Sequence, residues 1–160
     1  MGRPEVDWDV LRAAAVSAAA HAYCPYSGLQ VGAAGLVIGG AGLAVGGAGQ
    51  VVGGAGQVVG GTGQVVGGAG EGSRVVVGCN VENASYGLAL CAECTMAGQL
   101  RLTGGGQLAA VACRAGDGRL LMPCGRCRQV LYELGGPACL VDAPGGARPL
   151  ADLLPDAFGL

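Results

Sequence analysis

Hydrophobic and polar positions alternate with two different spacings along the chain, one helical and one extended. Residues 5 to 22 combine alanine with apolar residues at helical spacing, which predicts an amphipathic first helix. After the turn sequence CPYSG, residues 29 to 38 predict a buried strand of small residues. The β-branched run over 73 to 85 predicts a second strand that continues into a loop.

The second half of the chain continues this alternation of helices and strands. The predicted elements are, in order, a helix over 91–102, a buried strand over 107–115, a short strand before Pro123, a helix that ends at Gly135 and Gly136, a short strand over 138–143, and a last helical turn and tail over 151–160. Strands that alternate with helices in this way indicate an α/β layered fold.

A glycine-rich repeat separates the first two strands. Residues 39 to 73 read GGAGLAV, GGAGQVV, GGAGQVV, GGTGQVV and GGAGEGS, five copies of which the last is degenerate. No pair of large apolar residues recurs at coiled-coil spacing, and the period is too short for a solenoid. We interpret residues 1–160 as one domain in which 39–72 form a flexible expansion of a hairpin loop. The alternative is an assembly-prone β segment built on the repeated Val-Val pairs.

Composition and charge narrow the function. The chain has 9 basic and 11 acidic residues and only 4% aromatic residues, so we expect no nucleic-acid partner. Acidic residues near the N-terminus argue against a signal peptide, and no apolar span free of glycine is long enough to cross a membrane. We therefore expect no membrane segment and a cytoplasmic location. Thiols stay reduced there, so the 8 cysteines favour metal binding or catalysis over disulfides.

Two C-x-x-C pairs, Cys91 with Cys94 and Cys124 with Cys127, supply thiolates for a zinc site. The 29 residues between the pairs exceed the zinc-ribbon spacing, which is about 15 to 20 residues. A closed four-thiolate site would also have no use for Glu93. A glutamate two residues after one ligand, with Pro-Cys-x-x-Cys downstream, is instead typical of zinc deaminases, in which three ligands bind the metal and the glutamate does not.

Such a site leaves the fourth tetrahedral position of zinc to water, whose pKa the metal lowers to about 7. Cys91 and Cys124 each precede a predicted helix, where the positive end of the helix dipole favours a thiolate. Three thiolates and Zn²⁺ sum to a net charge of −1. Arg128, just after Cys127, is placed to offset this charge.

The segments NVENASYGLALCAEC, PCGRCRQV and LLPDAFG together resemble the small, homotetrameric cytidine deaminases. Outside the glycine-rich insertion the resemblance covers nearly the whole chain. It implies a three-layer α/β/α fold with a mixed central sheet of about five strands and one Zn²⁺ per subunit, held by Cys91, Cys124 and Cys127. It also implies a nucleoside substrate and a homotetramer with active sites shared between subunits.

The reaction that this resemblance implies is the hydrolytic deamination of cytidine and deoxycytidine to uridine and deoxyuridine, a step of pyrimidine salvage. A zinc-bound hydroxide attacks C4, and Glu93 acts as the proton shuttle to N3 and to the departing ammonia. Asn80 and Glu82 match the pair that binds the ribose hydroxyls, and the Ala92 N–H matches the contact to the pyrimidine carbonyl. Ala84, Tyr86 and Phe158 match positions that reach a neighbouring subunit's pocket, although Phe158 could instead anchor the tail in the core.

Two positions depart from the family pattern. Leu29 stands where a phenylalanine commonly packs on the base, and Cys94 stands where an arginine usually lies beside the zinc thiolates. The second change leaves charge compensation to Arg128 and, as a second candidate, to Arg126, whose pattern favours a solvated helix residue. The remaining cysteines are interpreted as small buried hydrophobic residues at positions 24, 79, 113 and 139.

Two other functions remain open at the level of sequence. One is deamination of a different aminopyrimidine nucleoside, of the blasticidin type, although that family lacks the ribose-reading NVENAS segment that this chain contains. The other is a non-catalytic four-cysteine zinc module with a glycine-rich interaction arm, in which Cys94 also binds the metal.

Overall fold

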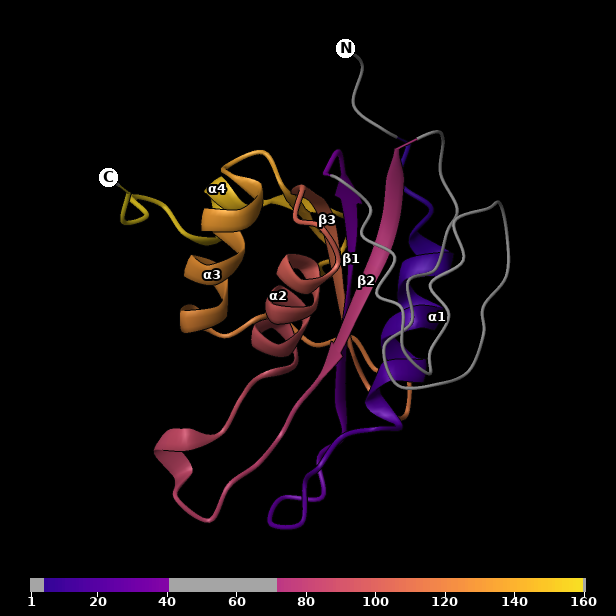
Figure 1. Ribbon diagram of the computed structural model, residues 1–160, viewed down its shortest axis with the longest axis vertical. Coiled ribbons are helices and arrows are strands. Elements are labelled where there is room, and N and C mark those ends of the chain that lie inside the picture. The colour runs from indigo at the N-terminus through magenta and orange to yellow at the C-terminus, as the bar shows by residue number, and fades with distance from the viewer. Residues whose placement is uncertain (1–4, 41–71, 160) are drawn as a thin grey trace.

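The computed structural model describes residues 5–40 and 72–159, which fold as a sheet between two layers of helices (Figure 1). The strands are β1 (Val31–Ile38), β2 (Ser73–Cys79), β3 (Gln107–Ala115), β4 (Leu140–Val141) and β5 (Arg148–Pro149). Their order in the sheet is β2-β1-β3-β4-β5, and only β3 and β4 run parallel. The helices are α1 (Trp8–Ala19), α2 (Ala92–Leu102), α3 (Gly125–Gly135) and α4 (Leu150–Leu153), with a 3-10 turn at Tyr86–Leu88. The predicted α/β fold with a mixed five-stranded sheet is confirmed.

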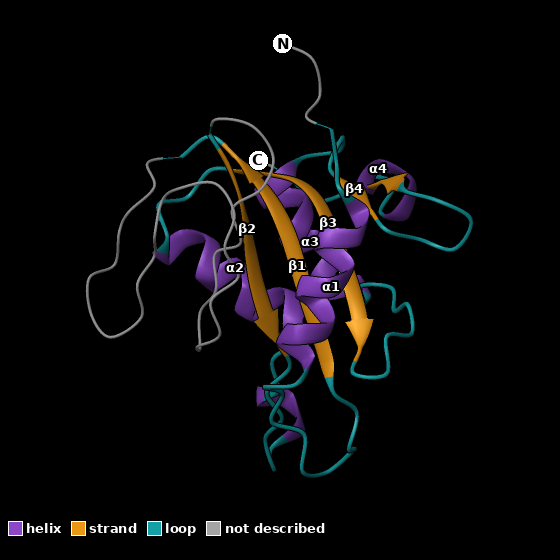
Figure 2. Ribbon diagram, turned by 90° about the vertical axis from the view of Figure 1, so that its right-hand side faces the viewer, coloured by secondary structure: helices purple, strands orange, loops and turns teal. Residues whose placement is uncertain are grey.

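Alternate residues of β1 face the two helical layers. On one face α1 lies so close to the strand that a Cβ added at Gly32 would be 1.9 Å from the carbonyl oxygen of Ala15. Leu11 of α1 packs on this face against Leu36. On the other face Val37 joins a second buried cluster that includes residues of α2 and α3. Figure 2 shows α1 in front of the sheet, with α2 and α3 behind it.

Element boundaries differ from the sequence-based expectations at several points. The first helix begins only at Trp8, because the side chain of Asp7 caps it by accepting from the N–H groups of Asp9 and Val10. The strand expected before Pro123 is reduced to one bridge between Leu120 and Arg114. The second strand ends at Cys79 and is followed by a loop, as expected, whereas β5 is a short edge strand that no sequence pattern indicated.

The hairpin of β1 and β2 is paired up to the point where the glycine-rich insertion begins. Ile38 is opposite Ser73, and the Gly39 N–H donates to the Gly72 carbonyl at 3.1 Å. Apart from its two ends, the loop expansion expected over residues 39–72 lies outside the described residues. Within the described ranges, no helix has the length and apolar character needed to cross a membrane.

Candidate metal centre

The metal site is built at the N-termini of the two helices that cover one face of the sheet. Cys91 is the N-cap residue of α2, and Cys124 is the N-cap residue of α3. Cys127 lies in the first turn of α3 and is fully buried. A Cβ added at Gly78 of β2 would lie 2.3 Å from the Met96 nitrogen, so this glycine lets α2 approach the sheet closely. The packing therefore places two positive helix ends beside one set of thiols.

The three predicted ligands converge. The sulfur atoms of Cys91, Cys124 and Cys127 all lie within 4.8 Å of one another, and those of Cys91 and Cys124 are 3.9 Å apart. Two thiolates at about 2.3 Å from one tetrahedral zinc lie about 3.8 Å apart, so this spacing fits zinc. Cys94, although described by the structure, is not a member of the group. The donor set is three thiolates, which matches the sulfur preference of zinc.

Burial, hydrogen bonds and neighbouring charges shift the pKa values of the three thiols in different directions. Burial raises the pKa of Cys91, and burial together with the nearby Glu93 carboxylate raises the pKa of Cys127. Burial also acts to raise the pKa of Cys124, but hydrogen bonds from Cys127 and Cys91 outweigh it and lower this pKa overall. Burial thus favours the protonated thiols of Cys91 and Cys127, and because zinc binds thiolates, its binding releases protons.

Arg126 contacts the metal-site sulfurs directly. Its Nη2 lies 3.7 Å from the Cys91 sulfur and 3.8 Å from the Cys94 sulfur, and it donates to the Ala89 carbonyl at 3.3 Å. The thiols raise the pKa of this guanidinium, Cys91 first among them, so the charge stays fixed. Arg126 is exposed, as expected, but its interpretation as a merely solvated helix residue is wrong.

Arg128, the residue expected to offset the thiolate charge, makes its hydrogen bonds elsewhere. Its Nε donates to the Pro123 carbonyl at 3.0 Å and its Nη1 to the Leu153 carbonyl at 2.8 Å, which ties α3 to α4. Two residues span about 200° around a helix, so Arg126 and Arg128 extend from different sides of α3. The contact with the ligand sulfur is therefore made by Arg126.

Glu93 lies in the first turn of α2 with only 5% of its surface exposed. Its Oε1 accepts a hydrogen bond from the thiol of Cys113, with 3.6 Å between sulfur and oxygen. Cys113 comes from β3 and is buried, as expected, but its contact with Glu93 was not predicted from the sequence. The signal available was the alternation of β3, which puts Cys113 on the same face as Val111. Cys24 and Cys79, also expected to be buried, are partly exposed.

Glu82, one of the residues predicted to bind the ribose, lines a pocket of about 310 Å³. The other lining residues are Tyr26, Ser27, Asn83, Tyr86 and Ala89. The Glu82 carboxylate accepts from the hydroxyl of Ser27 and from the N–H groups of Tyr26 (2.9 Å) and Ser27 (3.2 Å). The Ser27 hydroxyl, followed by these N–H groups, lowers the pKa of Glu82. Tyr26 and Ser27, interpreted from sequence only as a turn, therefore position this acid.

The other predicted binding residues lie around the same end of the sheet. The Asn80 side chain accepts from the Val31 N–H at 2.8 Å and donates to the Leu29 carbonyl at 2.9 Å. Ala92 is fully buried in the first turn of α2. Leu29 is 43% exposed, and Ala84 is exposed as well.

Tyr86 and Phe158 present large aromatic side chains to the surface. They are 82% and 71% exposed, respectively. The backbone of Phe158 is held by the Gln129 side chain, which accepts from its N–H at 3.2 Å and donates to its carbonyl at 2.9 Å. The alternative in which the Phe158 ring anchors the tail in the core of its own chain is therefore wrong.

A three-thiolate group at two helix N-termini, with a buried carboxylate on the adjoining helical turn, defines the site of a zinc-dependent deaminase on a three-layer α/β/α fold. Comparison with known proteins gives the particular family. The family described as "Cytidine and deoxycytidylate deaminase zinc-binding region" matches residues 62–142. The chain belongs to this cytidine deaminase family.

Individual relatives are similar over nearly their full length. A cytidine deaminase from Mycobacterium tuberculosis is 50% identical over 157 residues, covering 98% of this chain and 93% of the relative. One from Halalkalibacterium halodurans is 34% identical over 158 residues, covering 96% and 95%. The crystal structure of cytidine deaminase from Mycobacterium tuberculosis matches with a TM-score of 0.74 and 50% identity, covering 98% of this chain and 100% of that one. That from Mycobacterium leprae has a TM-score of 0.72 and 45% identity, covering 95% and 100%.

Proposed function

We propose that this enzyme hydrolyses cytidine and deoxycytidine to uridine and deoxyuridine with release of ammonia, a reaction of pyrimidine salvage. The observation that carries the proposal is the buried Glu93 carboxylate beside a convergent group of three sulfurs from which Cys94 is absent. A closed structural site would require a fourth thiolate. Three ligands instead leave zinc one position for a reacting water.

In this proposal, Glu93 transfers a proton in each chemical step. Zinc held by the three thiolates would lower the pKa of a water molecule and so supply the nucleophile for C4 of the pyrimidine. Glu93 takes the proton of that water and delivers it to N3 while the new C4–O bond forms. It then transfers a proton from the new hydroxyl to the 4-amino group, so that the C4–N bond breaks and ammonia leaves. The Ala92 N–H is assigned to the pyrimidine carbonyl, which fixes the ring.

Glu82 and Asn80 are assigned to the ribose hydroxyls. The low pKa of Glu82 keeps its carboxylate ionised and able to accept from a sugar hydroxyl. Asn80 uses one acceptor and one donor on the Leu29–Val31 backbone, and an amide side chain has further capacity for a hydroxyl. A free base would leave this polar pair without its partner, which favours nucleosides. The same pair argues against a substrate of the blasticidin type.

The exposed apolar side chains support a homotetramer with shared active sites. Tyr86, Leu88 and Phe158 are 82%, 66% and 71% exposed, so a partner could bury a large apolar area on them. Tyr86 also lines the pocket that contains Glu82. A neighbouring subunit packed on this surface would bury these rings and close the pocket, and Arg128 would hold α3 and α4 in place for that contact.

The test compares wild-type protein with Glu93→Gln. Zinc-replete wild type should convert cytidine, followed as a loss of ultraviolet absorbance, whereas Glu93→Gln should bind zinc normally and lose at least about 10³-fold in kcat, because the amide cannot accept the proton. Loss of metal in Glu93→Gln would show that Glu93 is a ligand or structural. Wild-type protein that holds zinc and does not deaminate cytidine would instead support the four-cysteine module, and turnover of blasticidin alone would support the other deaminase.

A further inference from the structure

Cys113 is a buried thiol to which the zinc chemistry assigns no role. It is 1% exposed, and it belongs to the same buried cluster as Ala92 and Met96 of α2. Its sulfur lies 3.6 Å from Oε1 of Glu93. Among the side chains of residues 5–40 and 72–159, the Cys113 thiol is the one that donates a hydrogen bond to the Glu93 carboxylate. The contact joins the sheet to the residue that moves the proton.

The strand holds Cys113 in a fixed place. Cys113 pairs with Ala33 of β1 on one side, and its carbonyl accepts from the Leu121 N–H at 3.1 Å on the other. The same carbonyl accepts from the Arg114 side chain at 2.8 Å. Glu93, in contrast, is a long side chain on the first turn of a helix, where several rotamers are available to it. A fixed donor on the sheet restricts which of them the carboxylate occupies.

The thiol is the donor in this pair. Burial, followed by the charge of Glu93, raises the pKa of Cys113 well above its ordinary value, so the sulfur keeps its proton. A carboxylate only accepts, and a thiol is a weak donor, so the S–H points toward Oε1. The bond is therefore too weak to hold Glu93 away from a proton that it must take and release.

We propose that Cys113 is a positioning residue that orients the Glu93 carboxylate for proton transfer through its S–H bond to Oε1. The inference deepens the proposed deaminase function and depends on it. Because Cys113 acts on the proton shuttle, its loss should lower kcat and leave zinc content and substrate binding nearly unchanged.

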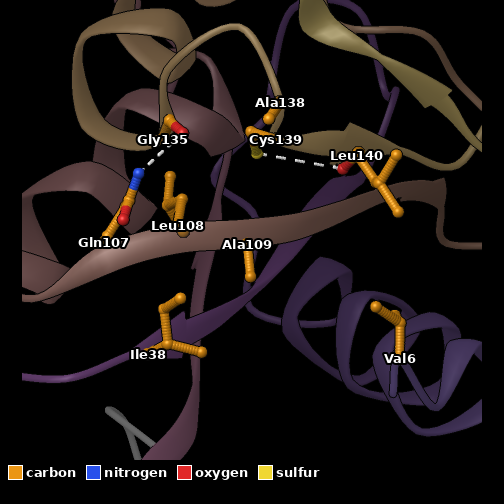
Figure 3. A pocket seen from close by; sticks show the side chains of 9 residues that line it. All are labelled: Val6, Ile38, Gln107, Leu108, Ala109, Gly135, Ala138, Cys139 and Leu140. Carbon is orange, nitrogen blue, oxygen red and sulfur yellow. Dashed lines mark hydrogen bonds between the residues drawn. The ribbon is translucent and has the colours of Figure 1, made fainter. Parts of the chain in front are cut away.

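Cys139 supplies a matched control. It is also 1% exposed, but it lines a pocket of about 190 Å³ at the start of β3, together with Leu108 and Ala109 (Figure 3). Its sulfur faces the Leu140 carbonyl at 3.9 Å, and Glu93 is not in the lining of that pocket. Along β3, Cys113 lies five residues after Leu108 and four after Ala109, nearer the other end of the strand. Cys139→Ala therefore removes a buried sulfur of the same kind without touching the proton shuttle.

The experiment measures kcat, KM and zinc content of wild type, Cys113→Ala, Cys113→Ser and Cys139→Ala with cytidine. Cys113→Ala should lower kcat by about fivefold, the size expected for one weak hydrogen bond, with KM within about twofold of wild type. Cys113→Ser keeps a donor and should recover most of that loss. A crystal structure of Cys113→Ala should show the Glu93 carboxylate in more than one rotamer.

Two results would overturn the inference alone. One is a Cys113→Ala variant with the kcat of Cys139→Ala. The other is an equal loss of kcat in Cys113→Ala and Cys113→Ser, because packing rather than hydrogen bonding would then explain the effect. A wild-type protein without any turnover of cytidine would overturn the proposed function and the inference together, so the two failures are distinguishable.

Discussion

At the scale of single residues, the guanidinium of Arg126 lies beside the sulfur atoms of Cys91 and Cys94. Three thiolates around Zn²⁺ leave a net negative charge, and a nearby cation lowers the free energy of that arrangement. The guanidinium of Arg126 is 3.7 Å from the Cys91 sulfur, whereas the hydrogen bonds of Arg128 end on carbonyl oxygens. Arginine therefore still lies beside the thiolates, although Cys94 occupies the position where the family usually has it.

Zinc affinity distinguishes these two arginines. Arg126→Ala should weaken zinc binding by about tenfold, the lower range for loss of a residue that contacts a metal ligand, whereas Arg128→Ala should leave it within about twofold. The measurement is competition against a chelator at one pH, with zinc content read directly. Arg126→Lys serves as a control that keeps the charge. If Arg128→Ala weakened zinc binding more than Arg126→Ala, the original assignment of charge compensation to Arg128 would stand.

At the scale of elements, a buried ion-pair cluster joins α1, β3 and the segment after β4. Asp142, 2% exposed, accepts from Arg12 of α1 at 2.8 Å and from Arg114 of β3. Burial acts to raise the pKa of Asp142, but the two arginines outweigh it and lower this pKa overall. Arg114 is 6% exposed, so it depends on this carboxylate for compensation of its charge. The cluster fixes α1 on the face of the sheet opposite the metal centre.

Removing the carboxylate should destabilise the fold. Asp142→Asn leaves the buried Arg114 charge unpaired, which we expect to lower the free energy of unfolding by about 3 to 5 kcal/mol near neutral pH. Because the folded-state pKa lies below the unfolded value of about 3.9, the contribution of Asp142 is complete above that pH and is lost as the pH falls toward the folded-state pKa. Urea unfolding at several pH values measures both effects. Equal acid sensitivity in wild type and Asp142→Asn would contradict the assignment.

At the scale of the whole molecule, the five described strands and the helices that carry the metal centre all lie outside residues 41–71. β1 and β2 are paired as far as Ile38 and Ser73, and Gly39 bonds to Gly72 just beyond. Gly40 and Gly72 both have positive φ, a conformation that suits a tight hairpin turn. The metal centre is built at the N-termini of α2, which packs on β1 and β2, and of α3, which packs on β3.

Deletion of residues 41–71 should therefore preserve the enzyme. We expect unchanged zinc content, kcat and oligomeric mass, together with a gain in unfolding free energy of about 2 kcal/mol, because closing a loop of about 36 residues costs that much more than closing one of about four. Light scattering and denaturant unfolding measure mass and stability. A folded, zinc-bound deletion variant that is inactive, or whose oligomeric mass per chain count differs from that of the wild type, would show that the repeats have a task in catalysis or assembly.

The sequence by itself predicted the layered α/β fold and the four cysteines from which the metal ligands are drawn, but it left open whether Cys94 is one of them. Both follow from local patterns, since the hydrophobic spacing fixes each element and the two C-x-x-C pairs place Cys91 and Cys124 at helix starts. Glu93 follows from its position two residues after a ligand. Short elements such as β5 escaped detection because two residues carry no periodicity.

Only the tertiary structure decided which residues surround those ligands. Whether Arg126 or Arg128 reaches the sulfurs depends on how α3 is rotated against α2, and both positions are equally basic in sequence. The contact of Cys113 with Glu93 and the pairing of Asp142 with Arg114 join residues 20 and 28 positions apart. Such contacts form only when helices pack on particular faces of the sheet. The spacing of residues within one element does not predict which side chains of two elements will be in contact.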